Sequence, residues 1–294
     1  MSSQRAQGIE GAKEPEAKSF FEPDPVLGWR LKPGVNRHFM RGDERLVMEV
    51  DDQGRRPVPG QPSHGEKTIA AYGCSCVFGK FITAQETFCA ELQRRLPSWC
   101  VENHGIGNFG NIHSFLQLLR ALRWSKPEYV MFGWIPGHLM RNVADARWIQ
   151  KNSGDSASHR SEHHWRTPRA YLDAEGKLQH RMVTFYRAEL ADIDVRDLGS
   201  DPYYMDQVSF AILERAAQIV HKAGGHFFLV TLLGALSARL AGLVAKAGIP
   251  IIDASVSGPD YLAPDGHHPG PRAHQHYAEK IHHYLTEHAK LVAP

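Results

Sequence analysis

From Lys67 onward the chain alternates between short apolar runs and longer stretches with apolar residues at helical spacing. Short apolar runs suit strands of a parallel sheet, because helices cover both faces of such a sheet. The predicted strands are residues 68–72, 99–102, 129–132, 227–232 and 249–253. The predicted helices are residues 83–96, 111–124, 205–222, 236–247 and 271–290. About five β/α units follow, which predicts an α/β fold with a parallel sheet between two helical layers.

The remaining segments do not fit this alternation. Residues 1–20 are polar, and we expect a disordered tail there. Residues 21–66 are rich in proline and glycine, with short apolar pieces, which predicts a small β-rich N-terminal cap. Residues 143–204 are highly charged and are predicted to form an insertion or lid. A single domain is therefore expected over residues 21–294.

Composition restricts the classes of partner. A net charge of +2, with histidine neutral, gives no broad electrostatic reason to bind nucleic acid or an anionic membrane. No apolar run is long enough to span a bilayer, and the N-terminal residues lack the apolar core of a secretion signal, so we expect a cytoplasmic protein. The chain has four cysteines, Cys74, Cys76, Cys89 and Cys100, which we expect to be reduced thiols. They lack the CxxC spacing of zinc sites.

Three segments with unusual residues follow predicted strands. Ser75 lies in a short turn of small residues after the first strand, and residues 103–111 combine asparagines with three glycines. Residues 265–269 read Asp-Gly-His-His-Pro, just before the last helix. Binding and catalytic sites of doubly wound sheets lie at the carboxyl ends of the strands, so these segments are candidates for one site.

The spacing of Asp265 and His268 suits the activation of a serine. A short turn lets the Asp265 carboxylate reach the imidazole of His268, which fixes its tautomer and stabilises its charged form. The other ring nitrogen can then take the proton of Ser75, whose hydroxyl is otherwise a weak nucleophile. The glycines of 103–111 leave backbone N–H groups able to point at a developing oxyanion.

Taken together, these segments resemble the sequence blocks of the SGNH/GDSL hydrolase family. Gly73-x-Ser75 resembles the Gly-Asp-Ser block, Asn103 and its glycines resemble the second block, and Asp265-x-x-His268-Pro269 resembles the last block. The resemblance covers roughly residues 67–290. It implies a flavodoxin-like three-layer fold, a Ser75–His268–Asp265 triad, hydrolysis or transfer of acyl esters on a small or carbohydrate-like substrate, and no metal or organic cofactor.

Departures from the family pattern concern the oxyanion hole. Cys74 replaces the aspartate of the first block, and Asn108 stands where the second block has its oxyanion glycine. Backbone N–H groups of Ser75, Gly107 and Asn108 are the donors expected for the hole. The family's third block, Gly-x-Asn-Asp, is not matched after Gly133. Nearby residues are candidates to replace its asparagine or bind substrate: Trp134, His138, Arg141 and Asn142.

Structural interpretations exist for each of these residues. Ser75 and Asp265 are residue types that also cap helices, and the glycines of 103–111 also suit a plain strand-to-helix turn. Cys74 and Cys76 suit buried packing better than nucleophilic chemistry, and His267 suits a neighbour of the base. Trp29, Trp134 and Trp165 suit either an acyl pocket or a core. His159, His163 and His164 suit a solvated loop better than a metal site.

Three functions are therefore open. The first is a serine ester hydrolase that works through an acyl-enzyme on Ser75. The second is an acyltransferase on the same triad, and the third is a non-catalytic binding protein with this fold. The expected partner is a small-molecule ester, with no nucleic acid or membrane.

Overall fold

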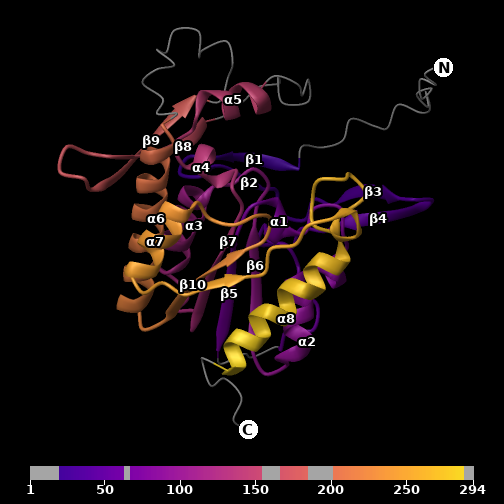
Figure 1. The fold of residues 1–294 in the computed structure, drawn as a ribbon. Helices are drawn as coiled ribbons and strands as arrows, with labels where there is room; N and C mark the ends of the chain where they lie inside the picture. The colour runs from indigo at the N-terminus through magenta and orange to yellow at the C-terminus, as the bar shows by residue number, and fades with distance from the viewer. Residues whose placement is uncertain (1–19, 63–66, 154–165, 185–200, 288–294) are drawn as a thin grey trace.

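A computed structural model describes residues 20–62, 67–153, 166–184 and 201–287 (Figure 1). Its central sheet has five parallel strands in the order β6-β5-β7-β10-β11. The strands are β5 (Thr68–Gly73), β6 (Cys100–Gly105), β7 (Tyr129–Trp134), β10 (His226–Thr231) and β11 (Ile251–Asp253). This order is that of flavodoxin-like doubly wound sheets, so the predicted fold class is confirmed.

Helices cover both faces of the sheet, as Figure 1 shows. On one face α2 (Phe88–Arg95) packs against α8 (Pro271–Glu287). On the other face α3 (Asn111–Ala121) and α7 (Ala238–Lys246) pack against α6 (Pro202–Lys222). Each helical layer encloses its own buried apolar cluster. The arrangement is a three-layer α/β/α sandwich.

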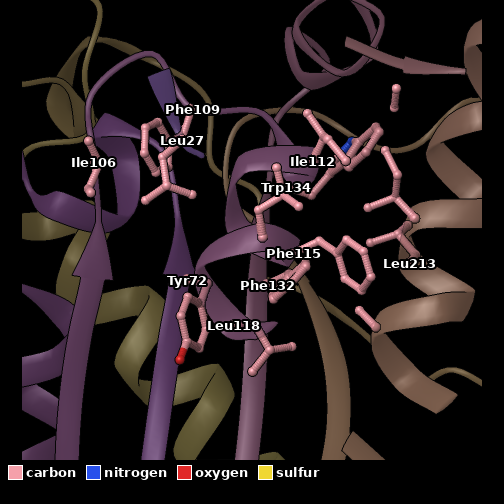
Figure 2. Packing of buried hydrophobic residues seen from close by; sticks show 14 of the residues in the cluster. Leu27, Tyr72, Ile106, Phe109, Ile112, Phe115, Leu118, Phe132, Trp134 and Leu213 are labelled. Atoms are coloured by element: carbon pink, nitrogen blue, oxygen red, sulfur yellow. The ribbon is translucent and has the colours of Figure 1, made fainter. Parts of the chain in front are cut away.

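From Ile69 to Gly73, strand β5 has a continuously apolar sequence because both of its faces are buried. Ala70 and Tyr72 point into the cluster beneath α3 and α6, whereas Ile69 and Ala71 point into the cluster beneath α2 and α8. Successive side chains of a strand face opposite sides of the sheet, so both sets must be apolar here. Figure 2 shows the first cluster, which joins Tyr72 to side chains of neighbouring strands and helices, among them Phe132, Phe115 and Leu213.

The N-terminal segment forms two small antiparallel pairs, in keeping with its predicted β-rich character. They are β1 (Phe21–Asp24) with β2 (Gly28–Leu31), and β3 (Arg37–Arg41) with β4 (Glu44–Met48). Arg120 of α3 donates two hydrogen bonds to the nearly buried carboxylate of Asp24, at 2.7 and 2.8 Å. Trp29 and Leu31 are buried in the same cluster as Tyr72. This segment therefore packs directly on the α/β core.

The described parts of the predicted insertion include one helix, one hairpin and the first residues of α6 (Pro202–Lys222). Helix α5 spans Ala146–Ser153, and β8 (Arg166–Leu172) pairs with β9 (Leu178–Thr184). Thr167 is fully buried, and its hydroxyl lies 3.1 Å from Nε2 of His113 in α3. The hairpin thus rests on the helical layer. Its role as a lid stays a prediction. Of the predicted tail at 1–20, residues 1–19 lie outside the described residues, and Phe20 is buried in the same cluster as Tyr72.

Three glycines make room for α1 (Ser75–Phe78) near the carboxyl ends of three adjacent strands, β6, β5 and β7. A Cβ atom on Gly73 of β5 or on Gly133 of β7 would lie 2.4 Å from Cγ2 of Val77. A Cβ on Gly105 of β6 would lie 2.2 Å from the backbone nitrogen of Phe78. Atoms cannot approach so closely, so α1 sits against the sheet only because these residues lack side chains.

The seating of α1 predicts a large effect for Gly105→Ala. The added methyl group would meet backbone atoms of Val77 and Phe78, which no change of rotamer can move. We expect a loss of about 1–3 kcal/mol in the free energy of unfolding, measured by urea denaturation.

Gly242→Ala is the matched control, because Gly242 is exposed in α7 and nothing lies within 4 Å of its added methyl group. That change should stabilise the protein by about 0.5–1 kcal/mol, since alanine favours helices. Equal stability of the two variants would contradict the steric account of Gly105.

Candidate active site

Ser75 is placed by the turn that joins β5 to α1. The strand ends at Gly73, and Cys74 is extended, with φ −91° and ψ −158°, immediately before the helix. Ser75 is therefore the first helical residue, directly beyond the carboxyl end of a strand that is buried from Ile69 to Gly73. Its side chain lies at the sheet edge with 7% of the residue exposed.

Asp265 and His268 lie in the loop between β11 and α8. Gly266, with φ +70°, turns the chain so that the Asp265 carboxylate faces back toward the loop. One carboxylate oxygen accepts the backbone N–H groups of His267 and His268, at 3.1 and 3.0 Å. The other lies 2.5 Å from Nδ1 of His268. The aspartate therefore fixes both the loop and the orientation of the imidazole ring.

The same imidazole reaches Ser75, although the two residues are far apart in sequence. Nε2 of His268 lies 3.0 Å from the Ser75 hydroxyl oxygen. Because Nδ1–H of His268 donates its hydrogen bond to the Asp265 carboxylate, Nε2 of the neutral ring is free to accept the hydroxyl proton. The structure thus brings together the three residues predicted to form the triad, in the order carboxylate, imidazole, hydroxyl.

The charges of this trio follow from burial and hydrogen bonding. Burial raises the pKa of Asp265, but the hydrogen bonds from His268 and His267 outweigh it and hold the pKa below its usual value. Burial lowers the pKa of His268, and the positive charge of Lys80 lowers it further, against the opposing effect of Asp265. At neutral pH the site therefore holds a charged carboxylate and a neutral imidazole.

The predicted oxyanion residues lie in a tight turn after β6. The N–H of Ile106 donates to the Gly73 carbonyl at 3.0 Å, and the N–H of Phe109 closes the turn on the Ile106 carbonyl at 3.3 Å. Asn108 has φ +64°, in the left-handed region that asparagine tolerates better than most residues. Within the described residues, the N–H groups of Gly107 and Asn108 have no hydrogen-bond acceptor. Both donors are thus available to a ligand.

Asn103, the residue that resembles the start of the second block, has a structural position. Its side-chain amide donates to the Val77 carbonyl at 2.9 Å and its oxygen accepts the N–H of Gly105 at 3.0 Å. The side chain thereby joins the end of β6 to α1. It ties the strand end that leads into the turn of Gly107 and Asn108 to the helix that begins with Ser75.

Two of the predicted substrate-binding residues are buried in the framework, and their assignment is corrected. Trp134 is fully buried in the apolar cluster of Figure 2. Asn142 of α4 (His138–Asn142) is fully buried as well. Its oxygen accepts the N–H of Ile112 at 3.1 Å, and its amide donates to the Ser209 hydroxyl at 2.9 Å. Asn142 thus joins α4 to α3 and α6, because packing has used both ends of its side chain.

Arg141 and His138 stay closer to the predicted site. Nη1 of Arg141 donates to the Phe109 carbonyl at 3.1 Å, so its guanidinium borders the turn that carries Asn108. His138 is fully buried, and burial lowers its pKa, although the neighbouring Cys74 thiol opposes this. Ile135, half-buried, occupies the position where the third family block has its asparagine. Contact of Arg141 or His138 with a substrate stays a prediction.

Cys74 and Cys76 flank Ser75 but are buried, with 1% and 2% exposed. They pack in the cluster beneath α2 and α8. His268 hydrogen-bonds to the hydroxyl between them, which favours serine as the nucleophile over either thiol.

Two neighbours of His268 were not anticipated from the sequence. The ring of Phe81 meets the imidazole edge-on, with centroids 5.9 Å apart, and the Lys80 ammonium lies 4.8 Å above the same Phe81 ring. Their only sequence signal is their position shortly after Ser75, because the fold alone brings them to a histidine near the other end of the chain.

Two further expectations concern metals and membranes. Within the residues that the structure describes, no group of three or more histidine, cysteine or acidic side chains is arranged to hold a metal ion. The histidines at 159, 163 and 164, and Trp165, lie outside those residues. In the described helices, none combines the length and apolar character needed to cross a bilayer.

Comparisons with known proteins give remote structural matches only. No family model and no curated protein matches the chain. Matching solved structures include TesA, at 15% identity over 74% of this chain and 98% of TesA, with a TM-score of 0.45. A GDSL-like lipase from Bacteroides thetaiotaomicron matches at 13% identity, over 77% of this chain and 91% of its own, with a TM-score of 0.44.

An acetyl xylan esterase from the rumen bacterium Butyrivibrio proteoclasticus matches at 10% identity, over 84% of this chain and 67% of its own, with a TM-score of 0.46. At these levels of likeness an activity cannot be carried over. The chemistry of this chain therefore rests on the geometry around Ser75.

The protonation states predict how Ser75 responds to pH. The hydroxyl becomes nucleophilic only while His268 is neutral, so its reaction with a fluorophosphonate should rise with pH through the pKa of His268. That pKa is lowered, so the midpoint should lie below the usual value of about 6.5. Intact-mass analysis of the adduct between about pH 4 and 9 measures it. A midpoint above 7 would contradict the assigned environment of His268.

Proposed function

We propose that the protein is a serine-dependent ester hydrolase of the SGNH/GDSL family. One observation carries the proposal: the hydrogen-bonded chain from Asp265 to His268 to Ser75, with separations of 2.5 and 3.0 Å. Both distances lie within the reach that proton transfer requires. These three hydrogen-bonded residues lie beyond the carboxyl ends of the strands of a flavodoxin-like sheet, where such folds bind ligands.

Acylation would begin with attack of the Ser75 oxygen on the ester carbonyl carbon. His268 takes the hydroxyl proton at Nε2, and the negative charge of Asp265 stabilises the imidazolium that forms. The carbonyl oxygen becomes an oxyanion. When the bond to the alcohol breaks, His268 gives its proton to the departing oxygen, which leaves an acyl-enzyme on Ser75. Water then attacks the acyl carbonyl carbon while His268 takes its proton. When the bond to the Ser75 oxygen breaks, His268 gives that proton to the serine, which releases the acid and restores the hydroxyl.

The oxyanion would be held by backbone donors. The N–H groups of Gly107 and Asn108 are unpaired within the described residues, and the N–H of Ser75 is the first of its helix. A single well-placed donor contributes about 3–4 kcal/mol to the stabilisation of a transition state. Because Ile135 has no donor to replace the side-chain amide of the family, we expect modest rates.

Ser75→Ala and His268→Ala test this proposal. Each should lower kcat/KM for p-nitrophenyl acetate by at least about a thousandfold, because the members of such a triad work as a unit. His267→Ala is the matched control: this exposed histidine is adjacent to His268, and within the described residues only its backbone N–H, and not its side chain, bonds to Asp265. It should retain most of the activity. A fully active Ser75→Ala variant would exclude the mechanism.

The products decide between hydrolysis and the two alternatives. With methanol or a sugar added as acceptor, a hydrolase releases mainly the free acid, whereas an acyltransferase forms mainly the new ester. Failure of a folded protein to cleave esters or to take a fluorophosphonate label on Ser75 would favour a binding protein.

A further inference from the structure

The turn after α1 holds an aromatic ring in a strained position beside the proposed base. The N–H of Ile82 donates to the Gly79 carbonyl at 3.4 Å, so Lys80 and Phe81 are the two central residues of the turn. Phe81 has φ +65°, a conformation that turns usually reserve for glycine or asparagine. A bulky residue there is a backbone outlier, and such strain gathers at functional sites.

Neighbouring groups hold this turn firmly. The Ser75 carbonyl accepts the N–H groups of Gly79 and Lys80, at 3.0 and 3.1 Å. Arg56, almost completely buried, donates to the Ile82 carbonyl at 2.6 Å. The surroundings therefore impose the strained conformation on Phe81, and its ring is fixed against the imidazole of His268.

Lys80 adds an unneutralised charge to the same place. Its ammonium lies over the Phe81 ring, and the residue is only partly exposed. Within the described residues, no carboxylate lies within 4.0 Å of this ammonium. Burial lowers the pKa of Lys80, and the positive charge of nearby Arg37 lowers it further. The negative charge of Asp265 opposes this effect, but the Asp265 oxygens already accept hydrogen bonds from His268 and from the backbone. A positive charge in this setting lacks a close counter-ion.

The position of the Lys80 ammonium near His268 indicates which part of a bound ester it would contact. His268 gives its proton to the departing alcohol, so the alcohol portion lies next to Nε2 during the reaction. Phe81 borders the His268 ring, and the Lys80 ammonium lies over the face of the same Phe81 ring. An alcohol that extends past His268 would therefore cross an apolar edge and reach an ammonium group.

We propose that Phe81 and Lys80 form a subsite for an anionic group, such as a carboxylate, on the alcohol portion of the ester substrate. The inference rests on the proposed esterase function and defines its substrate class. Lys80 acts there as a specificity-determining residue and takes no part in proton transfer. Phe81 supplies a rigid apolar surface that keeps the ammonium directed at the substrate.

Two esters of the same shape test the subsite: 3-acetoxybenzoate, whose leaving group is anionic, and 3-acetoxybenzamide, whose leaving group is neutral. The ratio of their kcat/KM values, each divided by the rate of hydroxide hydrolysis, measures the preference for charge. We expect the wild-type protein to prefer the anion by about tenfold, the ratio that one charge-assisted hydrogen bond of about 1.4 kcal/mol gives. Sodium chloride should weaken the preference.

Lys80→Gln should bring this ratio to about one, and Lys80→Arg should keep most of it. Because the readout is a ratio, a change in the pKa of His268 affects both esters alike. Lys67→Gln is the matched control, since the Lys67 ammonium also lies over an aromatic ring, that of Trp99, 5.2 Å away, but at the opposite end of β5. That variant should keep the wild-type ratio.

The failures of the two proposals can be told apart. Equal use of both esters by the wild-type protein, or an unchanged ratio in a folded Lys80→Gln variant, overturns the subsite while the esterase stands. Labelling of Ser75 by a fluorophosphonate without hydrolysis of either ester also contradicts the subsite alone. Absence of both labelling and hydrolysis overturns the esterase, and the subsite falls with it.

Discussion

The candidate site depends on how closely α1 approaches the sheet. Val77 fills the space that Gly73 and Gly133 leave on adjacent strands, and the backbone of Phe78 lies where a side chain of Gly105 would be. Asn103 adds hydrogen bonds that join the same helix to β6. Protein interiors are packed too densely for such a helix to settle at several depths. Ser75 is thus positioned by the three adjacent strands β6, β5 and β7.

The partner of Ser75 is positioned from the other end of the chain. Helix α8, which follows His268, is tied to α2 of its own layer and to the end of β10 by polar contacts made in the core. Nδ1 of His274 accepts the N–H of Phe88 at 3.0 Å, and the hydroxyl of Tyr277 donates to the Leu232 carbonyl at 2.9 Å. Burial lowers the pKa of His274 to about 3, so this ring remains a neutral acceptor. These contacts therefore fix the last helix against α2 of the first β/α unit and against the end of β10.

The sequence predicted those features that depend on local pattern. The five strands and their helices follow from apolar periodicity, and residues 75, 265 and 268 follow from short spacings after strands. Trp134 and Asn142 were misassigned because burial depends on which elements pack together. Nothing in the local sequence of Asn142 indicates that Ser209 and Ile112 will surround it.

Lys80 and Phe81 illustrate the same limit at the site itself. Their relation to His268 spans most of the chain, and the positive φ of Phe81 contradicts the usual preference of its residue type. Local rules are expected to fail at positions where function, and not folding, selects the residue.

The N-terminal segment completes the site from a third direction. Nε1 of Trp29 donates to the Gly107 carbonyl at 3.0 Å, and the ring of Phe21 lies close to the same glycine. A peptide unit whose carbonyl is bonded is held in orientation, so the N–H of Asn108, which belongs to that unit, is held as well. The segment expected to be a cap thus supports the donor turn from behind. Preorganised donors stabilise an oxyanion without reorganising during the reaction, so a segment far from Ser75 in sequence contributes to the chemistry proposed there.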